Sequence, residues 1–100
     1  MTEQIKQEAQ TLAPLLHSIF QTLHQEPELG NQEHHTAALI RRQLAEWGIS
    51  YSPCAGTGTV AVIQGGRPGK AIGFRADMDA LPITEGTGLP YASQKPGVMH

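Results

Sequence analysis

Apolar side chains recur at helical spacing along the start of the chain. Steps of four and three residues separate Ile5, Ala9, Leu12, Leu16, Ile19 and Leu23. Residues spaced in this way share one face of an α-helix, so the pattern predicts an amphipathic helix over residues 3–24. Pro14 interrupts the pattern, because the proline ring removes a backbone donor and clashes with the preceding turn. We expect a kink at Pro14 or the first turn of a second helical piece there.

A second apolar stripe follows a connection at residues 26–31. Its members are Ala37, Ile40, Leu44 and Trp47. The stripe stops at Gly48, a residue that commonly follows the end of a helix, and it predicts a helix over residues 32–47. Asn31 is a candidate N-cap for this helix, with Glu33 in the first turn.

Beyond Ile49 the helical spacing gives way to short β-prone runs separated by glycine and proline. Two of these runs cover residues 59–64 and 70–76, and the stretch GGRPGK between them has the composition of a turn. We expect the two runs to form a hairpin or neighbouring strands. The elements together predict an α/β fold, with two helices followed by β-strands, that is incomplete as a domain.

Charge and hydropathy exclude several classes of function. The seven Lys and Arg residues are scattered, so there is no basic stripe for nucleic acid. No apolar window approaches the roughly 18 residues of a membrane span, and the polar start of the chain is unlike a secretory signal. No membrane partner is expected, and a cytoplasmic location is the default. Cys54 is the only cysteine, which excludes an internal disulfide, and we interpret it as a passive thiol in a loop.

Two familiar catalytic motifs are also missing. The string GTGTV at residues 56–60 lacks the third glycine of a dinucleotide fingerprint and the lysine of a P-loop, so it is interpreted as a turn. No serine lies in a G-x-S-x-G frame, which leaves serine hydrolysis without support.

Asp77 and Asp79 stand one residue apart in FRADMDALPITE at residues 74–85. Asp77 follows the run at 70–76, and ligands of open α/β sheets gather at the carboxyl ends of strands. Two carboxylates this close repel each other, and a site keeps both ionised by supplying a cation or by orienting an imidazole. Metal binding, or the support of a metal ligand, is one interpretation. The other is that the pair caps a strand end or a turn.

The five histidines do not form an evident metal motif. His34 and His35 are adjacent, so on a helix their rings point about 100° apart and cannot share one ion. His17 and His24 lie two turns apart and are interpreted as helix-surface residues. His100 ends the chain, and its role depends on what lies around it.

Three strings, at residues 24–49, 74–85 and 87–100, closely resemble the M20-type metallo-amidohydrolases. They read HQEPELGNQEHHTAALIRRQLAEWGI, FRADMDALPITE and TGLPYASQKPGVMH, and they follow one another in the family's order. The branch that the chain resembles contains hippurate hydrolases, N-acyl-amino-acid deacylases and auxin-conjugate hydrolases.

The resemblance implies a two-domain enzyme several times longer than this chain. Its zinc-peptidase-like α/β catalytic domain would hold two divalent metal ions, with Zn²⁺, Mn²⁺, Co²⁺ or Ni²⁺ as the possible metals, and an inserted domain would form a homodimer. Residues 1–100 would be the N-terminal portion of the catalytic domain, and the dimerisation domain would be absent from this chain. The established metal ligands and the general-base glutamate would come after residue 100.

The resemblance also implies roles for individual residues. Asp79 matches an aspartate that orients a metal-binding histidine from behind it. Asp77 matches the position of that histidine, but as an aspartate it does not carry over as a metal ligand. His100 matches a histidine adjacent to the metal site that is not itself a ligand. The string from His24 to Leu29 matches the family's HxxPEL turn, for which packing between the two helices is a sufficient explanation.

The function implied by the resemblance is metal-dependent hydrolysis of the amide bond of a small N-acyl amino acid, as in hippurate hydrolases, aminoacylases and carboxypeptidase-like enzymes. We expect this activity of a full-length parent and expect the 100 residues alone to be inactive and free of metal. The alternative is a degenerate remnant that acts as a binding or interaction module.

Overall fold

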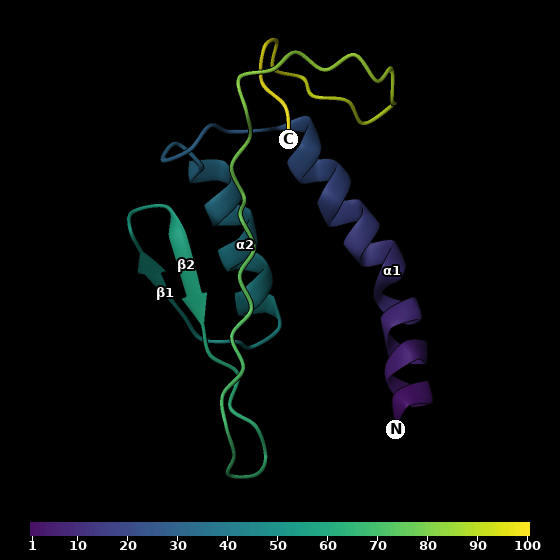
Figure 1. The fold of residues 1–100 in the computed structure, drawn as a ribbon, viewed down its shortest axis with the longest axis vertical. Coiled ribbons are helices and arrows are strands. Elements are labelled where there is room, and N and C mark those ends of the chain that lie inside the picture. The colour runs from purple at the N-terminus through teal and green to yellow at the C-terminus, as the bar shows by residue number, and fades with distance from the viewer.

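The computed structural model describes every residue from Met1 to His100 and contains two helices followed by one short antiparallel hairpin (Figure 1). The elements are α1 (Thr2–Gln25), α2 (His34–Glu46), β1 (Tyr51–Cys54) and β2 (Gly58–Ala61). This order confirms the prediction of two helices followed by strands. Neither helix combines the length and the apolar character needed to cross a membrane.

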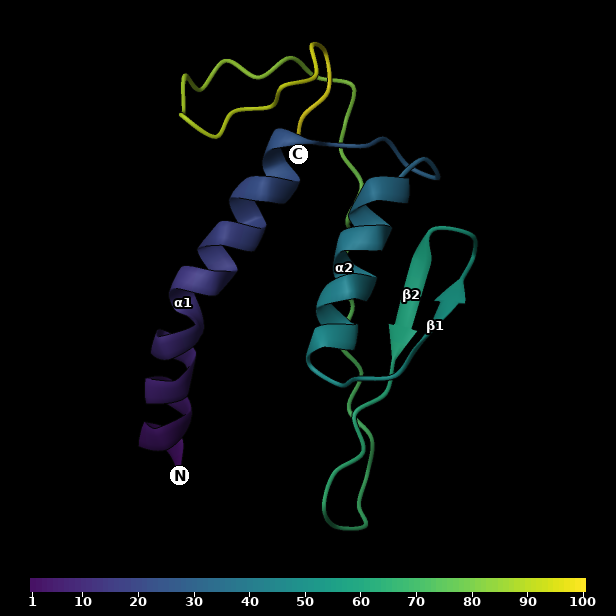
Figure 2. The same cartoon turned by 180° about the vertical axis from the view of Figure 1, so that it is seen from behind.

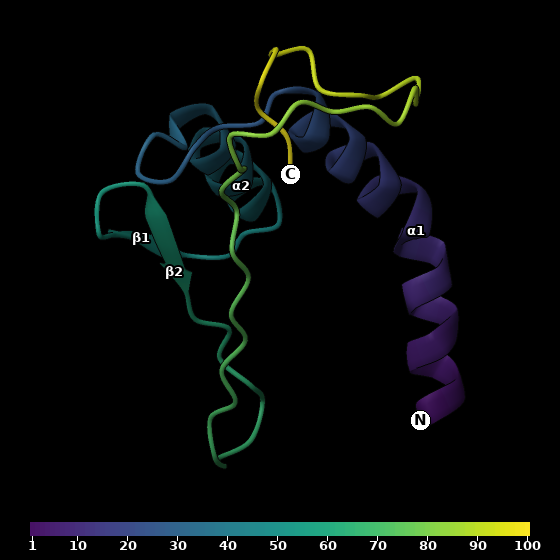
Figure 3. The same cartoon turned by 45° about the horizontal axis from the view of Figure 1, so that its top comes forward.

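Helix α1 is a single unbroken helix, and Pro14 lies inside it. Of the two alternatives predicted at Pro14, a second helical piece is excluded, whereas Figures 1 and 3 show that the axis of α1 changes direction partway along the helix, as a kink would require. Figures 1 and 2 show that α1 diverges from α2 toward its N-terminus, so most of it stands apart from the rest of the chain. The apolar stripe is consequently uncovered over most of its length: Ile5, Leu12 and Leu16 are 47–61% exposed, whereas Ile19 and Leu23, near the end of the helix, are half-buried.

Helix α2 begins at His34, two residues later than predicted, and Asn31 is not its cap. Asn31 instead has φ 66°, a left-handed conformation that turns the connection before the helix starts. The first turn of α2 is capped by the carboxylate of Glu28. This carboxylate accepts hydrogen bonds from the backbone N–H of His35 at 3.0 Å and of Thr36 at 2.6 Å. It also accepts one from the Thr36 hydroxyl at 2.6 Å.

Glu28 is buried, so its charge is held by these donors instead of by water. Burial by itself raises the pKa of Glu28, but the hydrogen bonds from Thr36 and His35 and the positive charge of Lys95 outweigh it and leave the pKa lowered. A negative charge at the N-terminus of a helix is also favoured by the helix dipole. The HxxPEL turn therefore does more than pack the two helices, because its glutamate caps the N-terminus of α2.

The hairpin forms between residues 51 and 61, where Tyr51 pairs with Ala61 and Cys54 with Gly58. The turn between the strands covers residues 55–57 and contains Gly56 with φ 81°. The prediction that the GTGTV string is a turn therefore holds for its first two residues, whereas residues 58–60 belong to β2. Gly58 is required for another reason: a Cβ at that position would lie 2.6 Å from the carbonyl oxygen of Cys54. Cys54, predicted to lie in a loop, is the last residue of β1 and is exposed.

Arg41 of α2 attaches the hairpin to the helix. Its Nε donates to the hydroxyl of Thr59 at 2.9 Å, and its Nη2 donates to the carbonyl of Gly58 at 2.8 Å. Near the turn, the Thr57 hydroxyl donates to the buried carboxylate of Glu33 at 3.3 Å. The hairpin is thus held to α2 by polar contacts.

The predicted pairing of residues 59–64 with 70–76 is wrong. Residues 62–79 form no helix or strand, and Figures 1 and 3 show them as a long open excursion that leaves the hairpin and returns. Four large apolar side chains in residues 62–76 are 74–95% exposed; they are Val62, Ile63, Ile72 and Phe74. A pair of strands is stable only when one face is covered, whereas the 51–61 pairing has a tight turn and the anchor from Arg41.

The buried part of the chain is a small polar junction. Only Ala37 and Ala80 are buried hydrophobic residues, whereas five of the eight buried residues are polar or charged. Two single bridges pass through this junction, joining Leu29 to Ala80 and Leu81 to Met99. The backbone N–H of Ala80 donates to the carbonyl of Glu28 at 2.7 Å. These bonds bring the C-terminal third of the chain against the ends of both helices (Figure 1).

Replacing Glu28 with alanine is expected to lower the free energy of unfolding by about 1–3 kcal/mol, because three donors at the start of α2 lose their acceptor. Urea denaturation followed by fluorescence of Trp47, the only tryptophan, measures this change. Glu26→Ala, which removes an exposed carboxylate from the same connection, is the matched control. Equal urea midpoints for the two variants would show that Glu28 is not the cap.

Candidate functional site

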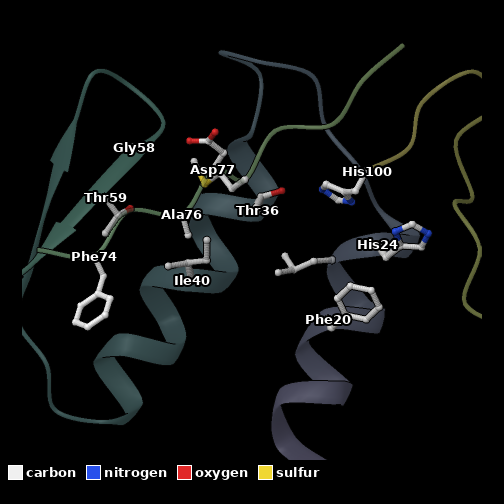
Figure 4. A pocket seen from close by; sticks show the side chains of 12 residues that line it. Phe20, His24, Thr36, Ile40, Gly58, Thr59, Phe74, Ala76, Asp77 and His100 are labelled. Atoms are coloured by element: carbon white, nitrogen blue, oxygen red, sulfur yellow. The ribbon is translucent and has the colours of Figure 1, made fainter. Parts of the chain in front are cut away.

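The two helices and the excursion enclose a hollow of about 630 Å³ (Figure 4). The side chains that matter for its chemistry come from distant parts of the chain: His24 from α1, Asp77 from the excursion and His100 from the end. Apolar side chains of α1, α2 and the excursion complete the lining, among them Phe20, Ile40 and Phe74. The hollow therefore combines an apolar wall with titratable groups at its rim.

Asp77 lies on this hollow but is not strongly held. Its carboxylate forms an ion pair with Arg75, whose Nη2 is 3.0 Å away. The two side chains are 68% and 88% exposed, so solvent screens the pair. Asp77 also does not follow a strand, because residues 70–76 form none. Figure 4 shows Asp77 on the opposite side of the hollow from His100.

Asp79 lies two residues further on, where the chain meets the connection between the helices. A Cβ built on Gly30 would stand 3.6 Å from Asp79 Oδ2, so the carboxylate packs over the backbone of that glycine. The next residue, Ala80, is fixed by its bond to Glu28 and by the bridge to Leu29. Asp79 is exposed and is not among the residues that line the hollow.

The structure thus brings two of the three predicted site residues, Asp77 and His100, to one hollow and leaves Asp79 beside it. No three side chains of His, Cys, Asp or Glu come close enough together to hold a metal ion. The carboxylates and imidazoles of this chain are suitable donors for divalent metals, but on their own they do not form a metal site.

His24 was predicted to lie on the helix surface, and that prediction is wrong. The residue is buried, and its Nε2 is 2.8 Å from Oε1 of Glu85. The side chains are 10% and 3% exposed, so this hydrogen bond is shielded from solvent. No local pattern could reveal the partner, because 61 residues separate the two positions. His17, which was also predicted to lie on the helix surface, is exposed, and so are His34 and His35.

The carboxylate of Glu85 is stabilised in its ionised form. Its carboxylate accepts hydrogen bonds from the Thr87 hydroxyl, from the backbone N–H of Ser93 at 2.8 Å and from His24. These donors, led by Thr87, lower the pKa of Glu85 to about 2, although burial opposes them. An ionised carboxylate can only accept hydrogen bonds, so Nε2 of His24 carries the hydrogen.

Aromatic rings surround His24 on several sides. Phe20, one turn earlier in α1, stacks on it with ring centroids 5.8 Å apart and an interplanar angle of 11°. Tyr91 meets both rings edge-on, at 5.9 Å from Phe20 and 6.0 Å from His24. His100 lies 5.8 Å from His24, tilted by 33°. The predicted site residue His100 therefore belongs to the same cluster as His24.

No family model matches the chain, but the chain is similar in sequence to several hydrolases. It is 52% identical over 91 residues to an N-acetyl-L-cysteine deacetylase of Bacillus subtilis, which covers 90% of this chain and 22% of the relative. It is 49% identical over 79 residues to a hippurate hydrolase of Campylobacter jejuni, covering 78% of this chain and 21% of that enzyme. The chain thus spans about a quarter or less of these relatives' length.

Solved structures show the same relationship. The YXEP protein of Bacillus subtilis, described as a dinuclear metal binding peptidase from the M20 family, superposes with a TM-score of 0.84 at 42% identity. The match covers 91% of this chain and 26% of that one. An aminohydrolase from methicillin-resistant Staphylococcus aureus, described as putative, superposes with a TM-score of 0.91 at 40% identity, covering 100% of this chain and 27% of that one.

Glu85 makes the stability of the chain depend on pH. Its folded pKa, about 2, is below its ordinary value of 4.5, so its contribution is full above 4.5 and disappears as the pH falls toward 2. The difference in free energy of unfolding between the native chain and Glu85→Gln should therefore be largest above about pH 5 and shrink toward pH 2. Urea titrations at several pH values measure it. A difference that does not change with pH would refute the assignment, and Glu26→Gln should show none at any pH.

Proposed function

Because this chain has the sequence and the fold of a segment of the M20 family of peptidases and amidohydrolases, we propose that it contributes to metal-dependent hydrolysis of the amide bond of N-acyl amino acids. One observation carries the proposal: 52% identity, over 90% of this chain, to an enzyme named for removing an acetyl group from N-acetyl-L-cysteine. The hippurate hydrolase fits the same description, since hippurate is also an N-acylated amino acid. The substrates would be small molecules of the hippurate, N-acetyl or auxin-conjugate type.

The proposed activity belongs to a protein as long as the relatives. Residues 1–100 would form the N-terminal portion of its catalytic domain, and a dimerisation domain that makes it a homodimer would lie outside this chain. Such a protein would be cytoplasmic. The uncovered stripe of α1 and the exposed excursion support this arrangement over an independent binding module, because a free-standing module would cover such apolar faces.

Two divalent metal ions, of Zn²⁺, Mn²⁺, Co²⁺ or Ni²⁺, are proposed as the cofactors of that longer protein. Bound metal of this kind lowers the pKa of a water molecule and polarises the amide carbonyl. Since this chain gathers no set of three ligands, the ligands would come from the remainder of the protein. We therefore expect the 100 residues alone to be inactive.

Within the site, this chain would supply supporting groups. Asp79 would accept the ring N–H of a metal-binding histidine and so fix the orientation of its imidazole. Its place at the fixed junction of Gly30 and Ala80 supports this role, since an orienting group must itself be held. Asp77 and His100 would act from the neighbouring hollow, which they both line. Asp77 is the weaker candidate for a catalytic role, because its carboxylate is exposed and paired with Arg75.

The complete gene product is expected to release glycine from hippurate, or the free amino acid from N-acetyl amino acids, only when loaded with a divalent metal. Removing the metal with a chelator should abolish the release, and adding it back should restore it. The 100-residue chain should release no amino acid under any of these conditions. A metal-loaded product that cleaves none of these amides would refute the proposed function.

Asp79→Asn in the complete product is expected to lower kcat/KM by about 10–100-fold, because an asparagine cannot hold an imidazole as a carboxylate does. Steady-state kinetics measure the loss, and metal content should be determined on the same sample. Glu46→Gln, which changes an exposed carboxylate at the end of α2, is the matched control. Equal kcat/KM values for the two variants would remove Asp79 from the site.

A further inference from the structure

His24 is held more firmly than any other titratable side chain on the hollow. Glu85 binds its Nε2, Phe20 stacks on one side of the ring and Tyr91 meets it edge-on. Asp77, by comparison, has only a solvent-exposed partner. Such an arrangement costs conformational freedom in several side chains, and its visible result is one fixed imidazole at the edge of the hollow (Figure 4).

Glu85 can fix the ring of His24 because its carboxylate accepts three hydrogen bonds and is itself held in place. The carboxylate accepts from His24 in α1, from Thr87 in the following turn and from the backbone N–H of Ser93. A further bond, from the N–H of Gln94 to the carbonyl of Gln25 at 2.9 Å, ties the same loop to the end of α1. Glu85 therefore sets both the place of the His24 ring and the nitrogen that carries its hydrogen.

The fixed ring of His24 contacts the imidazole of His100. Its backbone is located by the preceding residue, since Met99 and Leu81 exchange hydrogen bonds of 2.8 and 3.1 Å. Its side chain is exposed, so the bridge alone leaves the imidazole free to change rotamer. The aromatic contact recorded for His100 is the one with His24, at 5.8 Å between ring centroids. His24 is thus placed to select the rotamer of His100.

We propose that His24, held by Glu85, is a positioning residue that sets the imidazole of His100 at the rim of the hollow. The inference deepens the proposed function and rests on it for its purpose, because a group beside a catalytic centre must keep its orientation between turnovers. The physical statement itself concerns two imidazoles and a carboxylate within this chain. It can therefore be tested without metal or substrate.

The test uses NMR of the 100-residue chain with ¹⁵N-labelled histidine at neutral pH. In the native chain, His24 should be in the tautomer that carries hydrogen on Nε2, and its ring protons should give NOEs to those of His100. Glu85→Gln should make these NOEs about tenfold weaker, because an untethered ring exchanges rotamers and spends little time in contact. The amide of Met99 should keep its protection from hydrogen exchange. Glu26→Gln, an exposed carboxylate near the same end of α1, should leave every signal unchanged.

Each other outcome overturns the inference. If Glu85→Gln also removes the protection of Met99, the pair supports the loop as a whole and does not position a ring. If His24 in the native chain carries its hydrogen on Nδ1, or shows no NOE to His100, the inference fails even where Glu85→Gln does not fold. Hydrolysis by the complete product, measured separately, decides the proposed function, so the two can fail independently.

Discussion

The ionised carboxylate of Glu85 accepts hydrogen bonds from α1, from the turn at Thr87 and from the loop at Ser93. The C-terminal third of the chain has no helix and almost no strand, so such side-chain bonds determine where it lies. Without this carboxylate, the links between that loop and α1 would be the hydrogen bond from Gln94 to Gln25 and the aromatic contacts of Tyr91. The position of the His24 ring between Tyr91 and His100 therefore depends on this carboxylate.

Glu28 fixes the start of α2 through hydrogen bonds, as Glu85 fixes the end of α1. It, too, is a largely buried carboxylate whose pKa is lowered by hydrogen bonds that outweigh its burial. In a chain with only two buried hydrophobic residues, these two anions replace the apolar core that would normally order the connections. Directional bonds of this kind fix orientation more narrowly than apolar contact does, which suits a segment that presents side chains to a site.

The helices were predictable from sequence because their signal is local and periodic, and both lie where the apolar stripes indicated. What failed was long-range. The cap of α2 comes from Glu28, eight residues before Thr36, and the partner of His24 lies 61 residues away. The runs at 59–64 and 70–76 were predicted to pair with each other. The strands that do pair are 51–54 and 58–61, because the tight turn at Gly56 and the hydrogen bonds from Arg41 favour that hairpin. The spacing of Asp77 and Asp79 identified them as candidates. Spacing alone could not show that Asp77 lines the hollow whereas Asp79 lies beside it.

The excursion over residues 62–79 leaves backbone donors and acceptors unpaired along a stretch that carries Val62, Ile63, Ile72 and Phe74. An unpaired edge with apolar side chains is a template for any strand that reaches it, including the same stretch of another copy. Such a segment avoids self-association only while another part of the protein or a partner covers it. The region that shields it would pair these backbone groups and bury the four apolar side chains at the same time, so shielding this segment and completing a sheet would be a single event.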